Sequence, residues 1–211
     1  MASENASTQL TPEQAWQRLA EGNARFVAGT SAHPNQDAAR RESLAEGQHP
    51  FAVIFGCSDS RLAAEIIFDL GLGDTFVVRT AGQVLGAASL GSLEYAVAEL
   101  EVPLIVVLGH DSCGAVTATQ QAAESGKMPT GFVRDLVEAI MPSVIATRHD
   151  AGEAAGVNDM VREHTRQSAE RIVDQSKIIT QAVDEGRTAV LGVFYNLRDG
   201  KAELVSSSQG L

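Results

Sequence analysis

Short apolar runs alternate with longer amphipathic stretches along most of the chain, and this alternation predicts an α/β fold. Four apolar runs, bounded by glycine, proline or polar residues, are expected to form strands: residues 51–56, 75–79, 103–108 and 188–196. Helical spacing or cap signals mark six other stretches: residues 37–46, 62–70, 89–100, 113–124, 130–148 and 157–185. Because strands and helices alternate, we expect a mostly parallel central sheet, with right-handed crossovers, flanked by helices.

A hairpin signal follows the last of these apolar runs. Asp199 and Gly200 favour a tight turn into a short strand over residues 202–205. A strand that returns through such a turn must pair antiparallel with the strand before it. The sequence therefore predicts an antiparallel edge strand on the parallel sheet.

The N-terminal region is expected to form a polar tail followed by a helical arm. Residues 1–10 are polar and predict a disordered tail. Thr11 and Pro12 supply a cap and a first-turn proline, and Gly29 ends the arm, residues 11–29. Its apolar face consists of Trp16, Leu19, Phe26 and Val27. From the residues alone, packing of this arm on its own core is favoured over crossing to a second subunit.

The composition is that of one ordinary globular domain, which we expect to span residues 11–211. A formal net charge of -11 and a pI of about 4.8 disfavour nucleic acid and anionic membranes as partners, since both bind basic faces. The start lacks the basic and apolar regions of a secretory signal, and no apolar stretch approaches ~20 residues. We therefore expect a cytoplasmic protein, whose two cysteines are free or metal-bound thiols.

Both cysteines lie where a predicted strand gives way to polar residues. Cys57 follows the run over residues 51–56, and the run over residues 103–108 leads to His110 and Cys113. If the two runs are adjacent parallel strands, these side chains converge beyond the carboxyl edge of the sheet. A thiolate, imidazole and thiolate set favours zinc, and three protein ligands leave one position open for chemistry. The alternative is that the cysteines only pack in the core.

Asp59 and Arg61 lie immediately after the first cysteine. An arginine two residues away can hold the carboxylate in a bidentate pair. Held in this way, Asp59 could orient a nucleophile at the metal, and released, it could occupy the fourth coordination position. The alternative for this pair is a salt bridge that only braces the loop.

Several motifs make the chain resemble a β-class carbonic anhydrase of the bacterial type, over roughly residues 11–205. The matching stretches are residues 47–48, 57–61, 76–79, 94–97 and 109–114. The resemblance implies a mostly parallel sheet with an antiparallel edge, and dimers that exchange their N-terminal arms, often assembled into tetramers. It therefore reverses the expectation for residues 11–29, which become a dimerisation arm.

The resemblance also implies an activity and a role for particular residues. The activity is the reversible hydration of CO₂ to bicarbonate and a proton, with one Zn²⁺ per subunit. The implied zinc ligands are Cys57, His110 and Cys113, joined by Asp59 only in a closed state, and Asp59 with Arg61 forms the catalytic dyad. The implied substrate contacts are Gln48, Phe76, Tyr95 and Gly114.

One position departs from the family pattern. Some members have a tryptophan three residues before the first zinc cysteine, where it forms an inhibitory bicarbonate site with an arginine and a tyrosine. Here that position is Ile54, although Arg79 and Tyr195 match the other two residues. The departure argues against such an effector site in this chain.

Three other functions stay open at this point. The same site could hydrolyse CS₂ or COS, or the chain could be a zinc-binding or redox-sensing protein without activity. A phosphatase with Cys57 as nucleophile is disfavoured, because three residues between cysteine and Arg61 make a shorter loop than the usual phosphate cradle.

Overall fold

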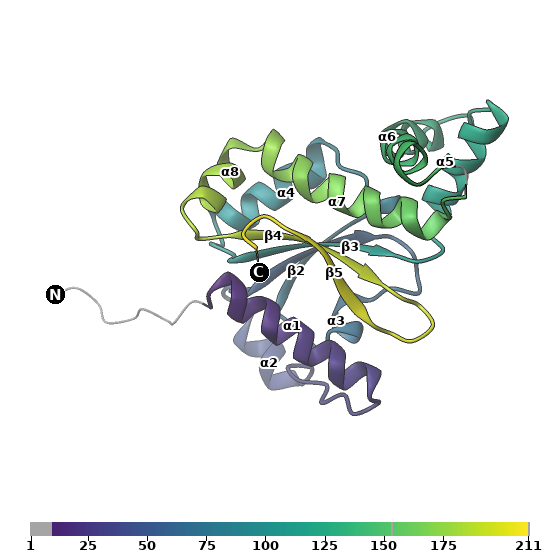
Figure 1. Ribbon diagram of the computed structural model, residues 1–211. Helices are drawn as coiled ribbons and strands as arrows, with labels where there is room; N and C mark the ends of the chain where they lie inside the picture. The colour runs from purple at the N-terminus through teal and green to yellow at the C-terminus, as the bar shows by residue number, and fades with distance from the viewer. Residues whose placement is uncertain (1–9, 153, 211) are drawn as a thin grey trace.

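The computed structural model describes residues 10–152 and 154–210, which are organised around one five-stranded sheet (Figure 1). The strands lie in the order β2-β1-β3-β4-β5. They are β1 (Ala52–Cys57), β2 (Thr75–Thr80), β3 (Leu104–His110), β4 (Ala189–Tyr195) and β5 (Ala202–Ser207). The first four pair in parallel, and β5 pairs antiparallel with β4. The predicted parallel sheet with an antiparallel edge is therefore confirmed.

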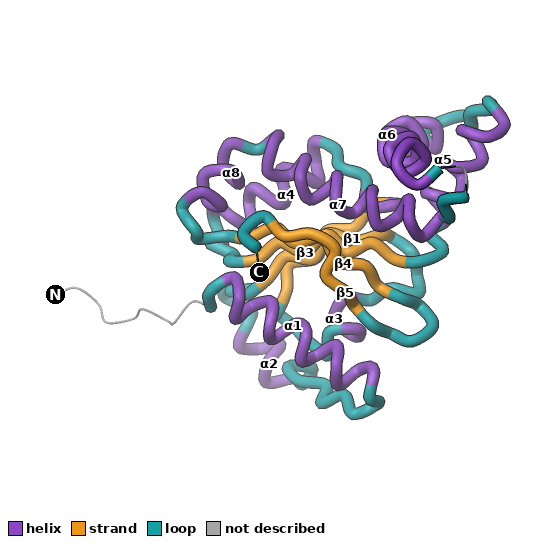
Figure 2. Tube along the Cα trace, viewed as in Figure 1, coloured by secondary structure: helices purple, strands orange, loops and turns teal. Residues whose placement is uncertain are grey.

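Helices cover both faces of the sheet, and two further helices project from one end (Figures 1 and 2). On one face lie α1 (Pro12–Val27), α2 (Ala38–Ser43) and α3 (Ala64–Ile67). On the other lie α4 (Ala87–Ala98), α7 (Val157–Gln175) and α8 (Lys177–Asp184). The helices that project are α5 (Gly114–Ser125) and α6 (Val133–Ala151), and a 3₁₀ turn, η1 (Ala81–Gln83), follows β2.

The central strands are apolar on both faces because both faces are covered. All residues of β1, β3 and β4 are buried. In β1, Ile54 packs into the cluster shared with α1 and α3, whereas Val53 and Phe55 pack toward α4, α7 and α8. This arrangement explains why the strands appear in the sequence as continuous apolar runs rather than as alternating ones.

Most observed helix ends lie within three residues of the predicted ones, but one predicted helix is divided in the structure and another is less than half as long. The single helix expected over residues 157–185 is wrong, because α7 ends at Gln175 and α8 begins at Lys177. Between them Ser176 is extended, and its Oγ accepts the backbone N–H of Ile179 and bonds to Glu94. The helix expected over residues 62–70 is only the four residues of α3. The Ser176 cap separates α7 from α8. After α3, the left-handed backbone of Asp69, with a φ of 49°, ends the helical hydrogen bonding.

The N-terminal arm begins and ends as predicted, and it lies against its own chain. Thr11 and Gln14 form a reciprocal capping box at the start of α1. Leu19 is fully buried in the cluster beneath the sheet. Gly22 lies so close to α3 that an added Cβ would meet the Phe68 carbonyl oxygen at 1.8 Å. The predicted tail falls outside the described residues except for Leu10. Arm exchange between subunits stays a prediction.

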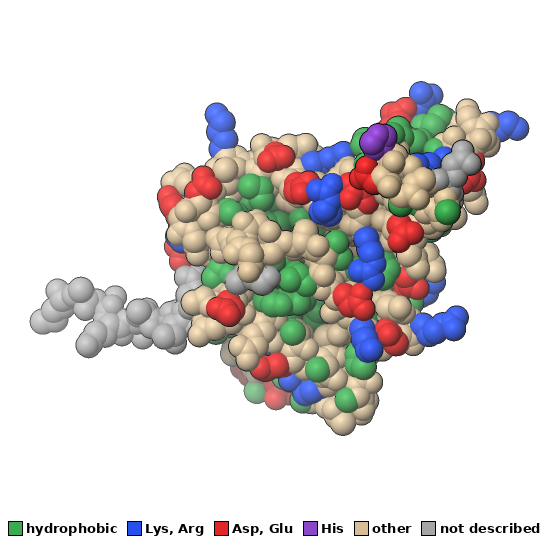
Figure 3. All heavy atoms as spheres, in the orientation of Figure 1, with side chains coloured by type: hydrophobic (Ala, Val, Ile, Leu, Met, Phe, Trp, Pro, Cys, Tyr) green, Lys and Arg blue, Asp and Glu red, His purple; other side chains and the backbone are tan. Residues whose placement is uncertain are grey.

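Charged side chains of both signs are intermixed on the face that Figure 3 shows. Across the described residues, none of the helices combines the length and the apolar character that a membrane crossing requires.

A buried carboxylate, Asp69, ties the arm and the loop after it to the segment between α3 and β2. It is 2% exposed and adopts a positive φ of 49°. Its oxygens accept the Arg25 Nε–H at 2.6 Å and the backbone N–H groups of Ala32 and His33 at 2.9 Å. Burial raises the pKa of Asp69, but these donors lower it more, so the net pKa lies below the ordinary value.

We expect Asp69→Ala to lower the free energy of unfolding by about 2–4 kcal/mol, because Arg25 and the backbone N–H groups of Ala32 and His33 lose the carboxylate that accepts from them. The depressed pKa means that this stabilisation is present at neutral pH and is lost as the pH falls through the carboxyl range. Urea denaturation at pH 7 and pH 4 measures both effects. The control is Asp184→Ala at an exposed carboxylate, and equal losses in the two variants at pH 7 would contradict the assignment.

Candidate metal centre

Three soft or borderline metal ligands meet at the carboxyl edge of the sheet. Cys57 ends β1, His110 ends β3, and Cys113 is the N-cap of α5. Their ligand atoms all lie within 4.8 Å of one another, and the three residues are between 0% and 6% exposed. Because β1 and β3 are adjacent and parallel, the loops that follow them leave the sheet side by side. The convergence expected from the sequence is therefore present.

The orientation of His110 is what a metal ligand requires. Its Nδ1 lies 2.8 Å from the carbonyl oxygen of Asp111, which can only accept, so Nδ1 carries the proton. Its Nε2 therefore presents a lone pair, and it is buried without a hydrogen-bond partner among the described residues. A buried nitrogen left in this state is costly unless something binds it. A tetrahedral cation held with the two sulfurs would do so, and a histidine whose other nitrogen bonds to a carbonyl is typical of zinc sites.

The two thiols are electrostatically coupled. A hydrogen bond between Cys57 and Cys113 lowers the pKa of Cys57 to about 4 and raises the pKa of Cys113, which burial raises further. The Gly82 N–H, 3.3 Å from the Cys57 Sγ, also stabilises the Cys57 thiolate. The first backbone N–H groups of α5 act in the same direction on Cys113. A divalent cation would replace the shared proton, because coordinated thiols are deprotonated.

Asp59 lies at the opening of this cluster and is held by Arg61. The guanidinium donates from Nε to Oδ1 at 2.9 Å and from Nη2 to Oδ2 at 2.7 Å, and the Arg61 backbone N–H also reaches Oδ1. This pairing lowers the pKa of Asp59, so the carboxylate is ionised. Its Oδ2 lies 4.0 Å from Nε2 of His110. The structure thus places an oriented acceptor beside the metal-binding atoms.

Residues that the sequence reasoning did not assign to the centre hold its loops in place. Arg79 donates to the carbonyl oxygens of Cys57 at 2.9 Å and Asp59 at 2.7 Å. Asn158 of α7 accepts the backbone N–H of Ser112 at 3.1 Å. The sequence indicates Arg79 only through its match to an effector site, and nothing near Asn158 in the sequence points to the metal.

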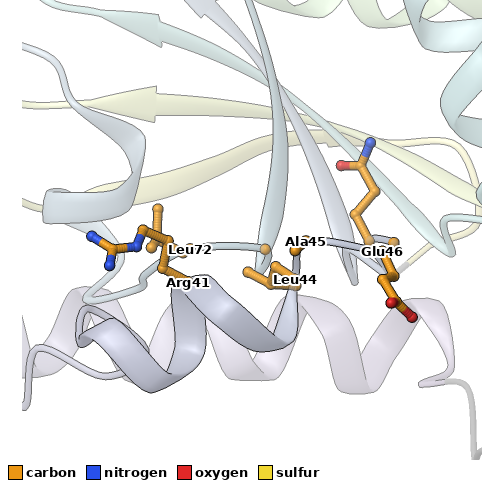
Figure 4. Close-up of a pocket in the computed structure, with 8 residues that line it drawn as sticks. Arg41, Leu44, Ala45, Glu46 and Leu72 are labelled. Atoms are coloured by element: carbon orange, nitrogen blue, oxygen red, sulfur yellow. The ribbon is translucent and has the colours of Figure 1, made fainter.

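Of the four expected substrate contacts, only one lies next to the metal-binding residues of its own chain. Gly114 follows Cys113 directly as the first residue of α5. Gln48 instead lines a separate cavity of about 520 Å³ beside α2, which contains none of the metal-binding residues (Figure 4). Phe76 and Tyr95 contact each other, with ring centroids 6.2 Å apart, where α4 meets β2 at the edge of the sheet. The structure does not bring these three side chains to the metal centre of their own chain.

The position of Ile54 leaves little space beside the centre. A cavity next to Cys57 is lined by Ile54, Val77, Arg79 and Leu108, among others, and its volume is about 10 Å³. Such a space is near the lower limit for one water molecule. It has no room for bicarbonate in this conformation.

Comparisons with known proteins decide the family. A family model described as carbonic anhydrase matches residues 52–202. The chain belongs to the β-class carbonic anhydrase family.

Close relatives and solved structures agree with this assignment. A carbonic anhydrase of Mycolicibacterium smegmatis is 53% identical over 195 residues, which is 92% of this chain and 94% of the relative. Carbonic anhydrase 2 of Mycobacterium tuberculosis is 53% identical over 193 residues, covering 92% of each. A structure from a study of two tetrameric β-carbonic anhydrases of Sordaria macrospora has a TM-score of 0.73 at 25% identity, covering 91% of this chain and 97% of that one.

In this carbonic anhydrase we expect Cys113→Ser to abolish stoichiometric zinc binding, because a serine hydroxyl is a far poorer zinc ligand than a thiolate. Metal analysis of the purified protein after gel filtration measures the loss. The neighbouring Ser112→Ala is the control and should keep one zinc per chain. Full zinc occupancy in Cys113→Ser would remove this cysteine from the site.

Proposed function

We propose that this protein catalyses the reversible hydration of CO₂ to bicarbonate and a proton, with one Zn²⁺ per subunit bound by Cys57, His110 and Cys113. The observation that carries the proposal is the buried Nε2 of His110, which has no hydrogen-bond partner within residues 10–152 and 154–210, lies near two thiols and is 4.0 Å from an arginine-held carboxylate. Membership of the carbonic anhydrase family supports it, as do the names of the two mycobacterial relatives.

The chemistry divides between the metal and the dyad. When bound, zinc supplies Lewis acidity, which makes hydroxide available near neutral pH. Asp59 would accept a hydrogen bond from the nucleophilic oxygen and so direct that oxygen's lone pair at the carbon of CO₂. Asp59 can act in this way only while it is ionised, and its pairing with Arg61 keeps it ionised.

Arg61 also determines where the carboxylate lies. Three hydrogen bonds from this one residue hold Asp59 beside the ligand cluster rather than within it. With a metal bound, this arrangement would correspond to an open site, because Asp59 would not be among its ligands. We propose that a closed state, with Asp59 as the fourth ligand, requires these hydrogen bonds to break.

The remaining substrate contacts are proposed to come from a second subunit. Gln48, Phe76 and Tyr95 lie away from their own metal centre, on the side of the sheet where β2 is the edge strand. Every residue of β2 is partly accessible, in contrast to the buried β1, and Tyr95 is 49% exposed. A homodimer or homotetramer that covers this edge would place these residues next to the partner's centre. We also propose that residues 11–29 contribute to the dimer.

The cellular location that we propose rests on the two cysteines rather than on a targeting signal. Both thiols are free and close enough to share a hydrogen bond. A reducing compartment would keep them available for zinc. We therefore propose a cytoplasmic location.

We expect Asp59→Asn to keep zinc but to lose CO₂ hydration by roughly 100-fold or more, because the amide preserves the shape and removes the charged acceptor. Stopped-flow hydration assays and metal analysis on the same preparation separate the two effects. Asp184→Asn, at an exposed carboxylate, is the control. Near-normal turnover in Asp59→Asn would remove this residue from the reaction.

The proposed assembly predicts that Tyr95→Arg lowers the sedimentation coefficient of the protein, since it places a charge where a partner would cover the β2 edge. Activity should fall with it, because the substrate contacts from the second subunit are lost. Leu204→Lys, a similar change on the opposite edge strand β5, is the matched control. If Tyr95→Arg sediments like the unaltered protein, the subunits associate elsewhere.

A further inference from the structure

His164 is a buried, titratable residue of α7 to which the proposed reaction gives no role. It is 2% exposed. Its Nε2 lies 2.9 Å from the carbonyl oxygen of Gly82, and its Nδ1 lies 3.2 Å from the Ser143 hydroxyl. A carbonyl oxygen can only accept, so Nε2 carries the proton and donates it to Gly82. Burial lowers the pKa of His164 to about 4, which leaves the ring neutral at pH 7 with this nitrogen protonated.

Gly82 connects this histidine to the metal centre. Its backbone N–H donates to the Sγ of Cys57 at 3.3 Å, while its carbonyl accepts from His164. The residue lies in η1 with a φ of 65°, and an added Cβ would meet the Cβ of Ala115 at 2.8 Å. The carbonyl and the N–H of Gly82, in a tightly enclosed turn, are therefore both hydrogen-bonded. The carbonyl bonds to α7, and the N–H bonds to the sulfur.

We propose that His164 is a positioning residue for the metal centre, which holds the Gly82 carbonyl and thereby aims the Gly82 N–H at the Cys57 sulfur. The proposal rests on the assignment of Cys57 as a metal ligand. An N–H donor at a thiolate stabilises its charge and sets how strongly the sulfur donates to the metal. Without the histidine, the Gly82 carbonyl would be buried without its donor, and the turn would lose the contact that fixes its orientation.

Two nearly isosteric replacements separate the hydrogen bond from the space that the ring fills. His164→Gln keeps an N–H donor at the reach of Nε2, whereas His164→Met has similar length and no donor. We expect His164→Met to lower zinc affinity roughly tenfold, as loss of an outer-shell partner commonly does, and His164→Gln to restore most of it. Competition with a chromophoric chelator measures the affinity.

A spectroscopic measurement reports on the electron density at the cysteine sulfur. In the cobalt-substituted protein, the thiolate-to-cobalt charge-transfer band should move to longer wavelength in His164→Met, because a sulfur without its N–H donor releases electron density more readily. It should stay near the wild-type position in His164→Gln. The control for packing damage is Ile172→Val, a buried change on the same helix, which should leave the band unmoved.

The possible outcomes are distinct. An unshifted band and unchanged zinc affinity in His164→Met would overturn the positioning role while leaving the proposed function intact. A wild-type protein that takes up neither zinc nor cobalt would overturn the metal centre and this inference together. If His164→Met does not fold, long-range ¹H–¹⁵N spectra of the wild-type protein decide the matter. They should show His164 as the neutral tautomer protonated at Nε2, and an Nδ1-protonated ring would overturn the proposal.

Discussion

The parallel pairing of β1 with β3 is the constraint on which the rest of the structure depends. Gly56 pairs with Leu108, so the two strands end close together and deliver Cys57 and His110 to the same edge of the sheet. Side chains alternate between faces along a strand, and a slip of one residue would exchange the buried sets on both faces. Because both faces are fully buried, the register is strongly specified. The hydrophobic core thus fixes the positions from which the ligands start.

Polar contacts from distant elements then fix the loops that the core leaves free. Arg79 binds two carbonyl oxygens of the first loop, and Asn158 holds the backbone of the second. The Asp111 carboxylate accepts the backbone N–H of Leu197, which ties the second loop to the segment after β4. These contacts involve backbone groups, so they constrain the path of the chain while the ligand side chains stay available. Helix α7 takes part through both Asn158 and His164, and it therefore supports both halves of the centre.

The sequence predicts most features whose signal is local, but it does not predict features that depend on tertiary contacts. The strands and the ligand cluster could be predicted, because each apolar run ends at residues whose chemistry is specific. The break at Ser176 is an exception, because its cap is local: the Oγ accepts the Ile179 N–H three residues on, and Glu94 of α4 adds a tertiary contact to the same hydroxyl. His164 resembled any other histidine until α7 was placed next to η1. The separation of Gln48 from the metal centre likewise depends on how α2 and the sheet edge are arranged.

The charges explain why, in the proposed mechanism, metal binding and site opening would be carried by different residues. Two thiolates would offset the formal charge of a bound Zn²⁺, so the metal would exert no large net attraction on a third anion. Asp59 gains more from Arg61, which offers a full positive charge and three donors in a fixed geometry. Its carboxylate nevertheless lies only 4.0 Å from the His110 nitrogen, so the proposed closed state would need the bonds to Arg61 to break but only a short movement of Asp59. In the proposed mechanism the cysteines and the histidine would therefore determine whether metal binds, and the strength of the Asp59–Arg61 pair would determine whether a bound metal is accessible.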